Sequence, residues 1–308
     1  MAAATAVTPQ DVMIPTAHGR IHARVWSGAD ASGAGASGVD TSGAAASGAD
    51  ASGVDTSGAA ASGAAASGAA ASDRATPIVL LHDSLGSVGL WRDFPANLAA
   101  ATGRTVIAYD RLGFGESDPH PGKLNADFVF DEAHDAFAAL ARHFELSRFI
   151  AFGHSVGGGM AVAIAAAYPQ ACAGVITESA QQFVEDRTLA GIREAGEQFR
   201  DPAQLERLKR YHGDKAQWVL DAWVHTWQSA EFADWNLDDT LPRVQAPFLA
   251  IHGENDEYGS MRHPEKFVAL AGGPSRMLAL AGCGHVPHRE NEAVVLEAVQ
   301  SFLARHKL

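Results

Sequence analysis

Short apolar runs alternate with longer amphipathic stretches along most of this 308-residue sequence, and this alternation limits the possible folds more than any other feature. Each run contains at least three consecutive apolar residues, rich in Val, Ile, Leu and Phe, which is typical of strands that are buried on both faces. The runs lie at residues 77–81, 104–110 and 148–152 and continue as AGVIT, PFLAI and RMLAL, before EAVVLEAVQSFLARH closes the series as a helix. The alternation predicts an α/β fold with a mostly parallel central sheet and helices on both faces.

The first quarter of the chain does not follow this alternation of apolar runs and amphipathic stretches. Val12–Trp26 predicts two short strands around a turn at His18-Gly19. Residues 27–75 then repeat Ala, Ser and Gly with a five-residue period and contain no aromatic residue and no leucine. Such a composition buries too little apolar area to offset the entropy lost on ordering, so we predict a disordered insertion between two strands. The insertion is either an expansion without function or a tether for a partner.

The alternation is interrupted again between Gln181 and Arg243, where the sequence pattern is helical and rich in tryptophan. We predict that residues 181–242 form a helical cap inserted after the sixth strand. The segments 1–26, 76–180 and 243–308 then form the core domain. Aromatic side chains on a cap above a pocket can both pack and contact a bound substrate. We predict substrate contacts for three of them: Phe183, Trp223 and Trp227.

The pentapeptide Gly153-His154-Ser155-Val156-Gly157 stands between an apolar run and a helical pattern that ends before Pro169. A G-x-S-x-G sequence between a strand and a helix predicts a sharp turn that lifts the serine hydroxyl above the strand ends. A Cβ at either glycine would collide with neighbouring backbone. The start of the helix also favours a developing negative charge. Ser155 is therefore the predicted nucleophile.

A serine nucleophile needs a base, and the base needs an acid that orients it. Asp256 follows the apolar run 248–251, and His285 follows the run 276–280. Both lie in loops at the carboxyl ends of predicted parallel strands, where side chains converge above the sheet. The chain order Ser, Asp, His is typical of enzymes with this turn. We predict that His285 is the general base and then the acid, and that Asp256 holds its imidazole tautomer.

Other residues are candidates for the last two roles. His288 follows His285 closely, but we expect it to cap or pack. Three further acids could replace Asp256: Glu178, Glu254 and Glu257. Cys283 is expected to be a small buried residue rather than a nucleophile. A zinc site on the two histidines lacks further ligands, so no metal is predicted.

Acyl chemistry also needs hydrogen-bond donors for an oxyanion. The backbone N–H of Val156, directly after the nucleophile, is one predicted donor. The loop LLHDSLGSVGLW, which follows the first core strand, supplies the second by its position. We assign that second donor to the backbone N–H of Ser84.

Five motifs resemble the α/β-hydrolase superfamily in their order: LLHDSLGS, YDRLGFGESD, GHSVGGG, IHGENDEYG and GCGHVPH. They cover the chain from about residue 76 to its end, and the cap falls at the superfamily's usual insertion point. The first loop usually reads His-Gly in the superfamily, whereas this chain has His82-Asp83. The stretch DSLGS is similar to loops of enol-lactone hydrolases. The resemblance implies that Asp110 and Arg111 are structural and brace the loop RLGFGES beside the site.

The resemblance also narrows the chemistry. Relatives that open epoxides or cleave carbon–halogen bonds use an aspartate where Ser155 stands, so the serine implies acyl transfer. We expect cleavage of an ester, lactone, thioester or amide of a small to medium apolar substrate. A C–C bond hydrolase, an aminopeptidase or an acyltransferase on the same triad are alternatives, as are a small-molecule receptor and a cofactor-free oxygenase. Glu185 and Asp186 either bind a substrate amine, as in an iminopeptidase, or are charges at a helix start.

Charge and composition narrow the partners. A net charge of −13 without a basic run disfavours nucleic acids and anionic membranes. No apolar stretch reaches the roughly 18–20 residues of a membrane span, and the first residues lack the pattern of a secretory signal. Two cysteines, Cys172 and Cys283, make no disulfide framework. We expect a cytoplasmic enzyme with a small-molecule substrate and no cofactor, and the sequence leaves the oligomeric state open.

Overall fold

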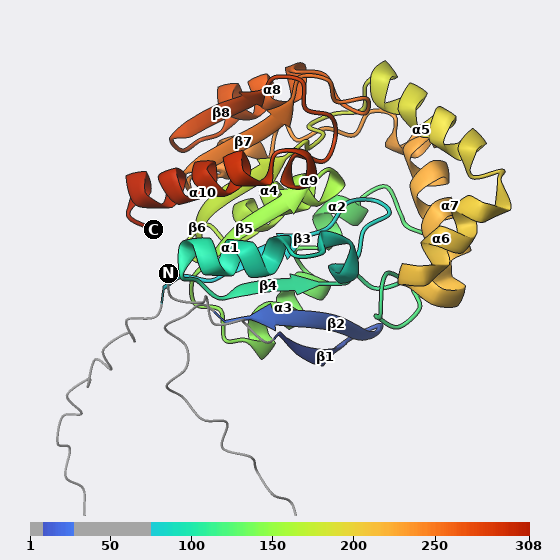
Figure 1. Cartoon of the computed structure of the whole chain (residues 1–308), viewed down its shortest axis with the longest axis horizontal. Coiled ribbons are helices and arrows are strands. Elements are labelled where there is room, and N and C mark those ends of the chain that lie inside the picture. Colours follow the sequence, from blue (N-terminus) through green and yellow to red (C-terminus); the bar gives the residue numbers. More distant parts are fainter. Residues whose placement is uncertain (1–8, 28–74) are drawn as a thin grey trace, which may run out of the picture.

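A computed structural model of the chain describes residues 9–27 and 75–308. The predicted repeat insertion, residues 27–75, lies outside the described residues except for its two end positions. Figure 1 shows a central sheet with helices on both of its faces and a separate group of helices beyond one end of the strands.

The strands account for the apolar runs and for the two predicted N-terminal strands. They are β1 (Gln10–Thr16), β2 (Gly19–Trp26), β3 (Ile78–Leu81), β4 (Val106–Tyr109), β5 (Phe149–His154), β6 (Cys172–Glu178), β7 (Phe248–Gly253) and β8 (Ser275–Leu280). In the described part of the chain they form one sheet in the order β1-β2-β4-β3-β5-β6-β7-β8. The pairs β1–β2 and β2–β4 are antiparallel, and all later neighbours are parallel. The predicted α/β fold with a mostly parallel sheet is therefore confirmed.

The core helices cover the sheet from both sides. They are α1 (Phe94–Thr102), α2 (Phe128–Asp131), α3 (Ala136–His143), α4 (Val156–Ala167), α8 (Arg262–Leu270), α9 (Pro287–Glu290) and α10 (Glu292–His306), with the short 3-10 helix η2 (Val88–Trp91) before α1. In β5, Ile150 and Phe152 pack toward the side of α1 and α10. Phe149 and Ala151 pack toward the side of α3, α4 and α8. Because both faces are buried, successive residues of the strand are all apolar.

One predicted helix is split in two. The pattern FDEAHDAFAALARHF predicts one helix, whereas the structure has α2 and α3 with turns at residues 132–135. Glu132, at this break, is buried and accepts a hydrogen bond of 2.6 Å from the Tyr109 hydroxyl. An acid in the core must be hydrogen-bonded, and this contact holds the chain at the break between the two helices.

A helical segment lies between β6 and β7, as the sequence predicts. It contains α5 (Asp186–Gln198), α6 (Pro202–His212), η3 (Gly213–Lys215), α7 (Ala216–Trp227), η4 (Ala230–Phe232) and η5 (Leu241–Arg243). Figure 1 shows α5, α6 and α7 together beyond the carboxyl ends of the parallel strands. We call these three helices the cap. The limits of the cap as a separate domain stay a prediction.

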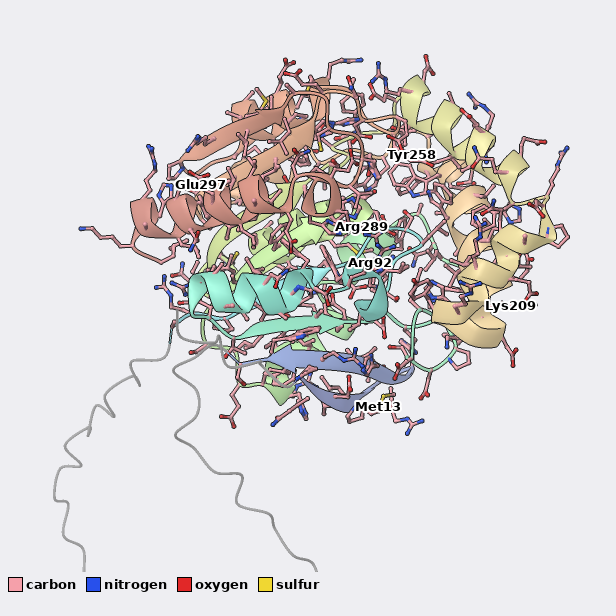
Figure 2. All side chains as sticks on the ribbon, viewed as in Figure 1. Met13, Arg92, Lys209, Tyr258, Arg289 and Glu297 are labelled. Carbon is pink, nitrogen blue, oxygen red and sulfur yellow. The ribbon has the colours of Figure 1, made fainter. Side chains whose placement is uncertain are left out.

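The cap is joined to the core by specific contacts. The Thr188 hydroxyl, on α5, donates to the backbone oxygen of Tyr258 at 2.6 Å. In Figure 2, Tyr258 lies where α5 approaches the core.

No helix within residues 9–27 and 75–308 is long and apolar enough to cross a bilayer.

Candidate active site

The turn between β5 and α4 holds Ser155 in a strained conformation. Its φ is 55° and its ψ is −126°, a combination that residues with a side chain rarely adopt. The two flanking glycines make the turn possible. A Cβ on Gly153 would lie 2.0 Å from the carbonyl oxygen of Gly157, and a Cβ on Gly157 would lie 2.2 Å from the carbonyl oxygen of Leu81. Both contacts are too short for any side chain, so the tight turn requires glycine at both positions.

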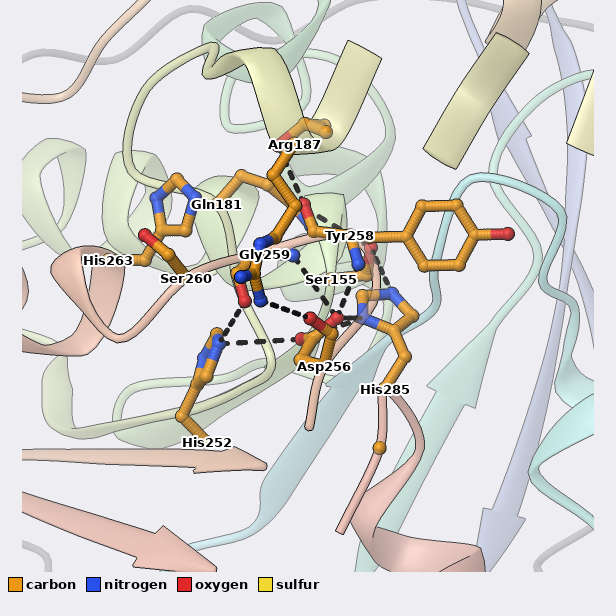
Figure 3. A network of polar contacts seen from close by, with 12 residues as sticks. Ser155, Gln181, Arg187, His252, Asp256, Tyr258, Gly259, Ser260, His263 and His285 are labelled. Atoms are coloured by element: carbon orange, nitrogen blue, oxygen red, sulfur yellow. Dashed lines mark hydrogen bonds and ion pairs between the residues drawn. The ribbon is translucent and has the colours of Figure 1, made fainter. Parts of the chain in front are cut away.

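The structure brings the three predicted residues together from three separate segments. His285, in the loop after β8, places its Nε2 atom 3.1 Å from the Ser155 hydroxyl oxygen. The Nδ1 atom of the same ring lies 2.8 and 2.9 Å from the two carboxylate oxygens of Asp256, in the turn after β7. Figure 3 shows this line of contacts from the serine to the carboxylate. The spacing suits transfer of a proton between the serine and the imidazole.

Asp256 is fully buried and its charge is held by several donors. Burial raises its pKa, but the neighbouring His285 ring and the backbone N–H of Tyr258 outweigh it, so the pKa lies below its ordinary value. The N–H groups of Tyr258 and Gly259 donate to one carboxylate oxygen at 2.8 and 3.2 Å. An ionised acid only accepts hydrogen bonds, so Nδ1 of His285 donates to it. Nε2 is then free to accept the serine proton.

The competing candidates are engaged elsewhere or exposed. Glu178 is fully buried, and its two oxygens accept the backbone N–H of His288 and, at 2.8 Å, the Nδ1 atom of the same residue. This buried pair accounts for both the alternative acid and the alternative base. Glu254 and Glu257 are exposed to solvent. The structure therefore brings Asp256, rather than the other acids, to His285.

A cavity of about 180 Å³ opens over the Ser155 hydroxyl. It is lined by Asp83, Ser84, Leu85, His154, Ser155, Gln181, Thr188, Ile192, Trp223, Trp227, Tyr258, His285 and Val286. Trp223 and Trp227, both on α7, were predicted to contact substrate and lie on its wall. The other lining residues come from the loop after β3, from α5, from the Ser155 turn and from the loops after β6, β7 and β8, so the cap covers a pocket whose floor is the strand-end turn.

Phe183, the third predicted substrate contact, is not among the residues that line this cavity, and its contact with substrate stays a prediction. Its ring packs against the His263 ring, with 4.5 Å between the centroids, and the Arg262 guanidinium lies 4.9 Å from its centre. A β-bridge pairs Phe183 with Asn236. This bridge fixes the backbone at the start of the helical segment and leaves the ring on α8 rather than over the serine.

The predicted oxyanion donors lie at the carboxyl ends of the parallel strands, near Ser155. Val156 is the first residue of α4, directly after the nucleophile, and Ser84 lines the cavity. The loop around Ser84 is held by Asp83, whose carboxylate accepts the N–H of Leu85 at 2.8 Å. The role of the two N–H groups as oxyanion donors stays a prediction.

The loop RLGFGES is braced as the resemblance implied. The buried carboxylate of Asp110 accepts the N–H of Val88 at 2.7 Å and that of Glu116 at 3.0 Å. Arg111, also buried, donates to the backbone oxygen of Asp83 at 2.9 Å. These contacts tie the loop to the segment that lines the cavity.

Glu185, a candidate for binding a substrate amine, is used in a different way. Its carboxylate accepts the N–H of Ser260 at 2.6 Å and the hydroxyl of the same residue at 2.9 Å, and it lies 3.1 Å from His263 Nε2. Burial raises its pKa, but these partners outweigh burial and lower the pKa to about 2. Glu185 thus holds the turn after β7 to the start of α5. Asp186 is exposed at the first position of α5.

Sequence reasoning did not single out several of the cavity residues, and three of these have polar contacts at or beside the serine. The Ser155 hydroxyl lies 3.3 Å from the side-chain oxygen of Gln181, which is a second acceptor for its proton. Nδ1 of His154 lies 3.3 Å from a carboxylate oxygen of Asp83 beside the serine. The departure from His-Gly at His82-Asp83 was the one sequence signal that pointed to this pair.

The described residues 9–27 and 75–308 contain no cluster of three or more His, Cys, Asp or Glu side chains arranged to hold a metal ion.

Both cysteines are buried. Burial raises the pKa of the Cys172 thiol to about 12 and that of the Cys283 thiol to about 11, which makes both poor nucleophiles.

Comparison with known proteins identifies the class that this fold and site define. The family model described as alpha/beta hydrolase fold matches residues 76–292. The match covers more than half of the chain, and the chain therefore belongs to the α/β-hydrolase family.

Individual relatives differ in what they do. The human serine hydrolase BPHL is 34% identical over 160 residues, which are 49% of this chain and 53% of that protein. The alignment thus spans about half the length of the human protein. A proline iminopeptidase of Lactobacillus helveticus is 23% identical over 274 residues, covering 75% of this chain and 90% of the relative.

Solved structures with the same fold cover nearly the whole chain. Proline iminopeptidase from Mycobacterium smegmatis has a TM-score of 0.63 and 21% identity, covering 96% of this chain and 98% of that one. A thermophilic esterase from Thermogutta terrifontis has a TM-score of 0.62 and 20% identity, covering 96% and 99%. At this level of identity the likeness concerns the fold.

Proposed function

We propose that this chain is a serine hydrolase that cleaves a carboxylic ester-type bond, in an ester, lactone or thioester. The proposal rests on one observation, the continuous line of contacts from Ser155 through His285 to the ionised Asp256. This line ends at the floor of a cavity, where a substrate carbonyl can reach the serine. Membership of the α/β-hydrolase family supports hydrolytic chemistry at that position.

The reaction has two halves. His285 Nε2 takes the hydroxyl proton as the Ser155 oxygen attacks the substrate carbonyl, and the imidazolium that forms is stabilised by Asp256. The N–H groups of Val156 and Ser84 donate to the oxyanion of the tetrahedral intermediate. The intermediate collapses when His285 returns the proton to the leaving oxygen or sulfur, and an acyl-enzyme remains on Ser155. Water then repeats the sequence and releases the acid.

The walls of the cavity support an apolar substrate. Five apolar side chains face the space above the serine: Leu85, Ile192, Trp223, Trp227 and Val286. Apolar walls with a few placed polar groups favour an apolar acyl or aromatic group. The volume of about 180 Å³ suits a small to medium substrate.

Active-site labelling tests the acyl-enzyme directly. We expect a fluorophosphonate probe to modify Ser155, and we expect Ser155→Ala to lose both the label and the turnover of p-nitrophenyl esters. Thermal unfolding of the variant should match that of the unaltered protein, because alanine removes a single oxygen. An alanine variant that keeps full turnover of its substrate would refute the acyl-enzyme.

A panel of substrates separates the ester proposal from the peptidase alternative. The panel contains p-nitrophenyl esters of graded acyl length, lactones, thioesters and proline p-nitroanilide. We expect the highest kcat/KM among the esters, lactones and thioesters. The likeness to iminopeptidases makes the anilide the informative comparison, and a kcat/KM for the anilide above all the others would replace the ester assignment with a peptidase.

A further inference from the structure

The side chain of His154 bridges the two loops that flank the nucleophile. His154 is the last residue of β5 and is 1% exposed. Its Nε2 atom lies 2.8 Å from the backbone oxygen of His285, in the loop after β8. Its Nδ1 atom lies 3.3 Å from a carboxylate oxygen of Asp83, in the loop after β3. One buried ring therefore contacts both the base's loop and the loop that lines the cavity.

The two partners determine which protons the ring carries. A carbonyl oxygen can only accept a hydrogen bond, so Nε2 of His154 must carry a proton. If Nδ1 were unprotonated, its lone pair would face the carboxylate of Asp83 at 3.3 Å, and the two would repel each other. Protonation of Nδ1 turns this repulsion into an ion pair. The geometry therefore favours a doubly protonated imidazolium.

The charges around the pair agree with this proton count. Burial lowers the pKa of His154, but Asp83, Glu178 and the carbonyl of His285 outweigh burial and hold the pKa above its ordinary value. Burial raises the pKa of Asp83, yet its contact with His154 holds that pKa far below the ordinary value. Two further rings face His154, those of His285 and His288, each with its centroid 5.1 Å away.

An ionised Asp83 beside the serine poses an electrostatic problem for catalysis. Asp83 lines the same cavity as Ser155, next to Ser84, the predicted oxyanion donor. A carboxylate at this place opposes the negative charge that develops on the substrate oxygen. The Asp83 side chain is 30% exposed, so solvent screens this interaction only in part. A positive charge fixed next to the Asp83 carboxylate reduces this repulsion.

We propose that His154 is a cationic positioning residue, which neutralises Asp83 beside the oxyanion site and anchors the loop of His285 through its backbone oxygen. The proposal rests on the proposed hydrolytic function, since the charge that must be protected is that of an acyl-transfer intermediate. It predicts that the cation is needed only because Asp83 is negative.

A double-mutant experiment in the full chain tests this dependence. His154→Gln keeps a neutral donor but removes the charge, and we expect it to lower kcat for the best p-nitrophenyl ester by at least 100-fold with little change in KM. Asp83→Asn alone should change kcat by less than tenfold. The double variant should recover to within tenfold of the unaltered enzyme. A double variant as slow as His154→Gln would overturn the charge role.

His263 provides a matched control, because it is a buried histidine that shares no hydrogen-bond partner with Asp83. Its Nδ1 accepts the N–H of Gln182 at 3.1 Å, and its Nε2 lies 3.1 Å from a carboxylate oxygen of Glu185. The effect of His263→Gln on kcat should therefore combine additively with that of Asp83→Asn. Rescue of His263→Gln by Asp83→Asn would mean that rescue is unspecific, and the proposal would fail.

A direct measurement keeps the proposal testable even if a variant fails to fold. Nitrogen-15 NMR of the histidine rings in the unaltered protein at pH 7 should show a buried ring with both nitrogens protonated besides that of His22, whose nitrogens lie 2.7 and 2.8 Å from two carboxylates. The signal of this further ring should be lost in His154→Gln or shifted in Asp83→Asn. A His154 ring with one unprotonated nitrogen would overturn the proposal. This readout needs no turnover, so loss of the proposed function, shown by an active Ser155→Ala, can be told apart from loss of the cation.

Discussion

Asp256 presents both of its carboxylate oxygens to a single nitrogen of His285, at 2.8 and 2.9 Å. This contact fixes the proton on Nδ1 and orients the ring, which leaves the Nε2 lone pair directed at the Ser155 hydroxyl 3.1 Å away. The buried carboxylate of Asp256 therefore determines which of the two ring nitrogens carries the proton and which one accepts it from the serine.

Replacing Asp256 with asparagine should therefore disable the base while keeping its position. The amide can present its NH₂ group to Nδ1 and so favour the wrong tautomer, and we expect kcat on the best ester to fall by about 10⁴-fold. KM should change little, because the carboxylate does not line the cavity. Steady-state kinetics of the variant check this. Glu257→Gln, the same exchange at an exposed neighbour, should stay within twofold, and a loss below tenfold for Asp256→Asn would contradict the assigned role.

Gln181 gives a second prediction, because its side-chain oxygen lies 3.3 Å from the Ser155 hydroxyl oxygen. Gln181→Glu places a negative charge next to the Ser155 oxygen, close to the carbon on which the tetrahedral intermediate and its negative charge form. At an effective dielectric constant of about 20, two such charges repel by roughly 4 kcal/mol, so kcat should fall by about 10²- to 10³-fold. The pH profile of kcat should show recovery toward acid pH as the new carboxyl is protonated. Gln181→Leu is the uncharged control, and equal losses in the two variants would exclude an electrostatic cause.

The turn at Ser155 predicts a large difference between two glycine-to-alanine substitutions. A Cβ on Gly153 would lie 2.0 Å from a backbone oxygen, whereas a Cβ on Gly122 would have no neighbour within 4 Å. We expect Gly153→Ala to lower the free energy of unfolding by more than about 3 kcal/mol or to prevent folding, since overpacking and backbone strain add. Gly122→Ala should change it by less than about 1 kcal/mol. Chemical denaturation measures both, and a Gly153→Ala protein of normal stability would contradict the close packing described for the turn.

Trp223 on α7 should set the acyl length that the cavity accepts. It lines the cavity and packs edge-on against Tyr258, with 5.9 Å between the ring centroids. Trp223→Leu enlarges the space, so kcat/KM should shift toward longer acyl chains in a series of p-nitrophenyl esters. Trp218→Leu is the control on the same helix, because Trp218 packs on Phe114 and His120 away from the cavity. An unchanged preference in Trp223→Leu would remove this residue from the substrate site.

Much of the fold follows from local sequence. Strands such as β5 and β7 each begin with four consecutive apolar residues because helices cover both faces of the sheet, and this pattern is visible without coordinates. The break between α2 and α3 was not predicted. The reason is that it depends on the inward turn of Glu132 toward Tyr109, and Tyr109 comes from a strand that precedes it by more than twenty residues.

The sequence by itself determined where the turn with Ser155 lies, because only glycine fits beside its backbone, and it limited the base and the acid to loops after later strands. Tertiary structure decided which side chains meet. Glu178 and Asp256 both follow strands of the same sheet, yet His288 occupies the first and His285 contacts the second. The Phe183 ring packs against His263, and the carboxylate of Asp83 lies 3.3 Å from Nδ1 of His154. A side chain's direction depends on neighbours from distant segments, and those neighbours are chosen only when the whole chain packs.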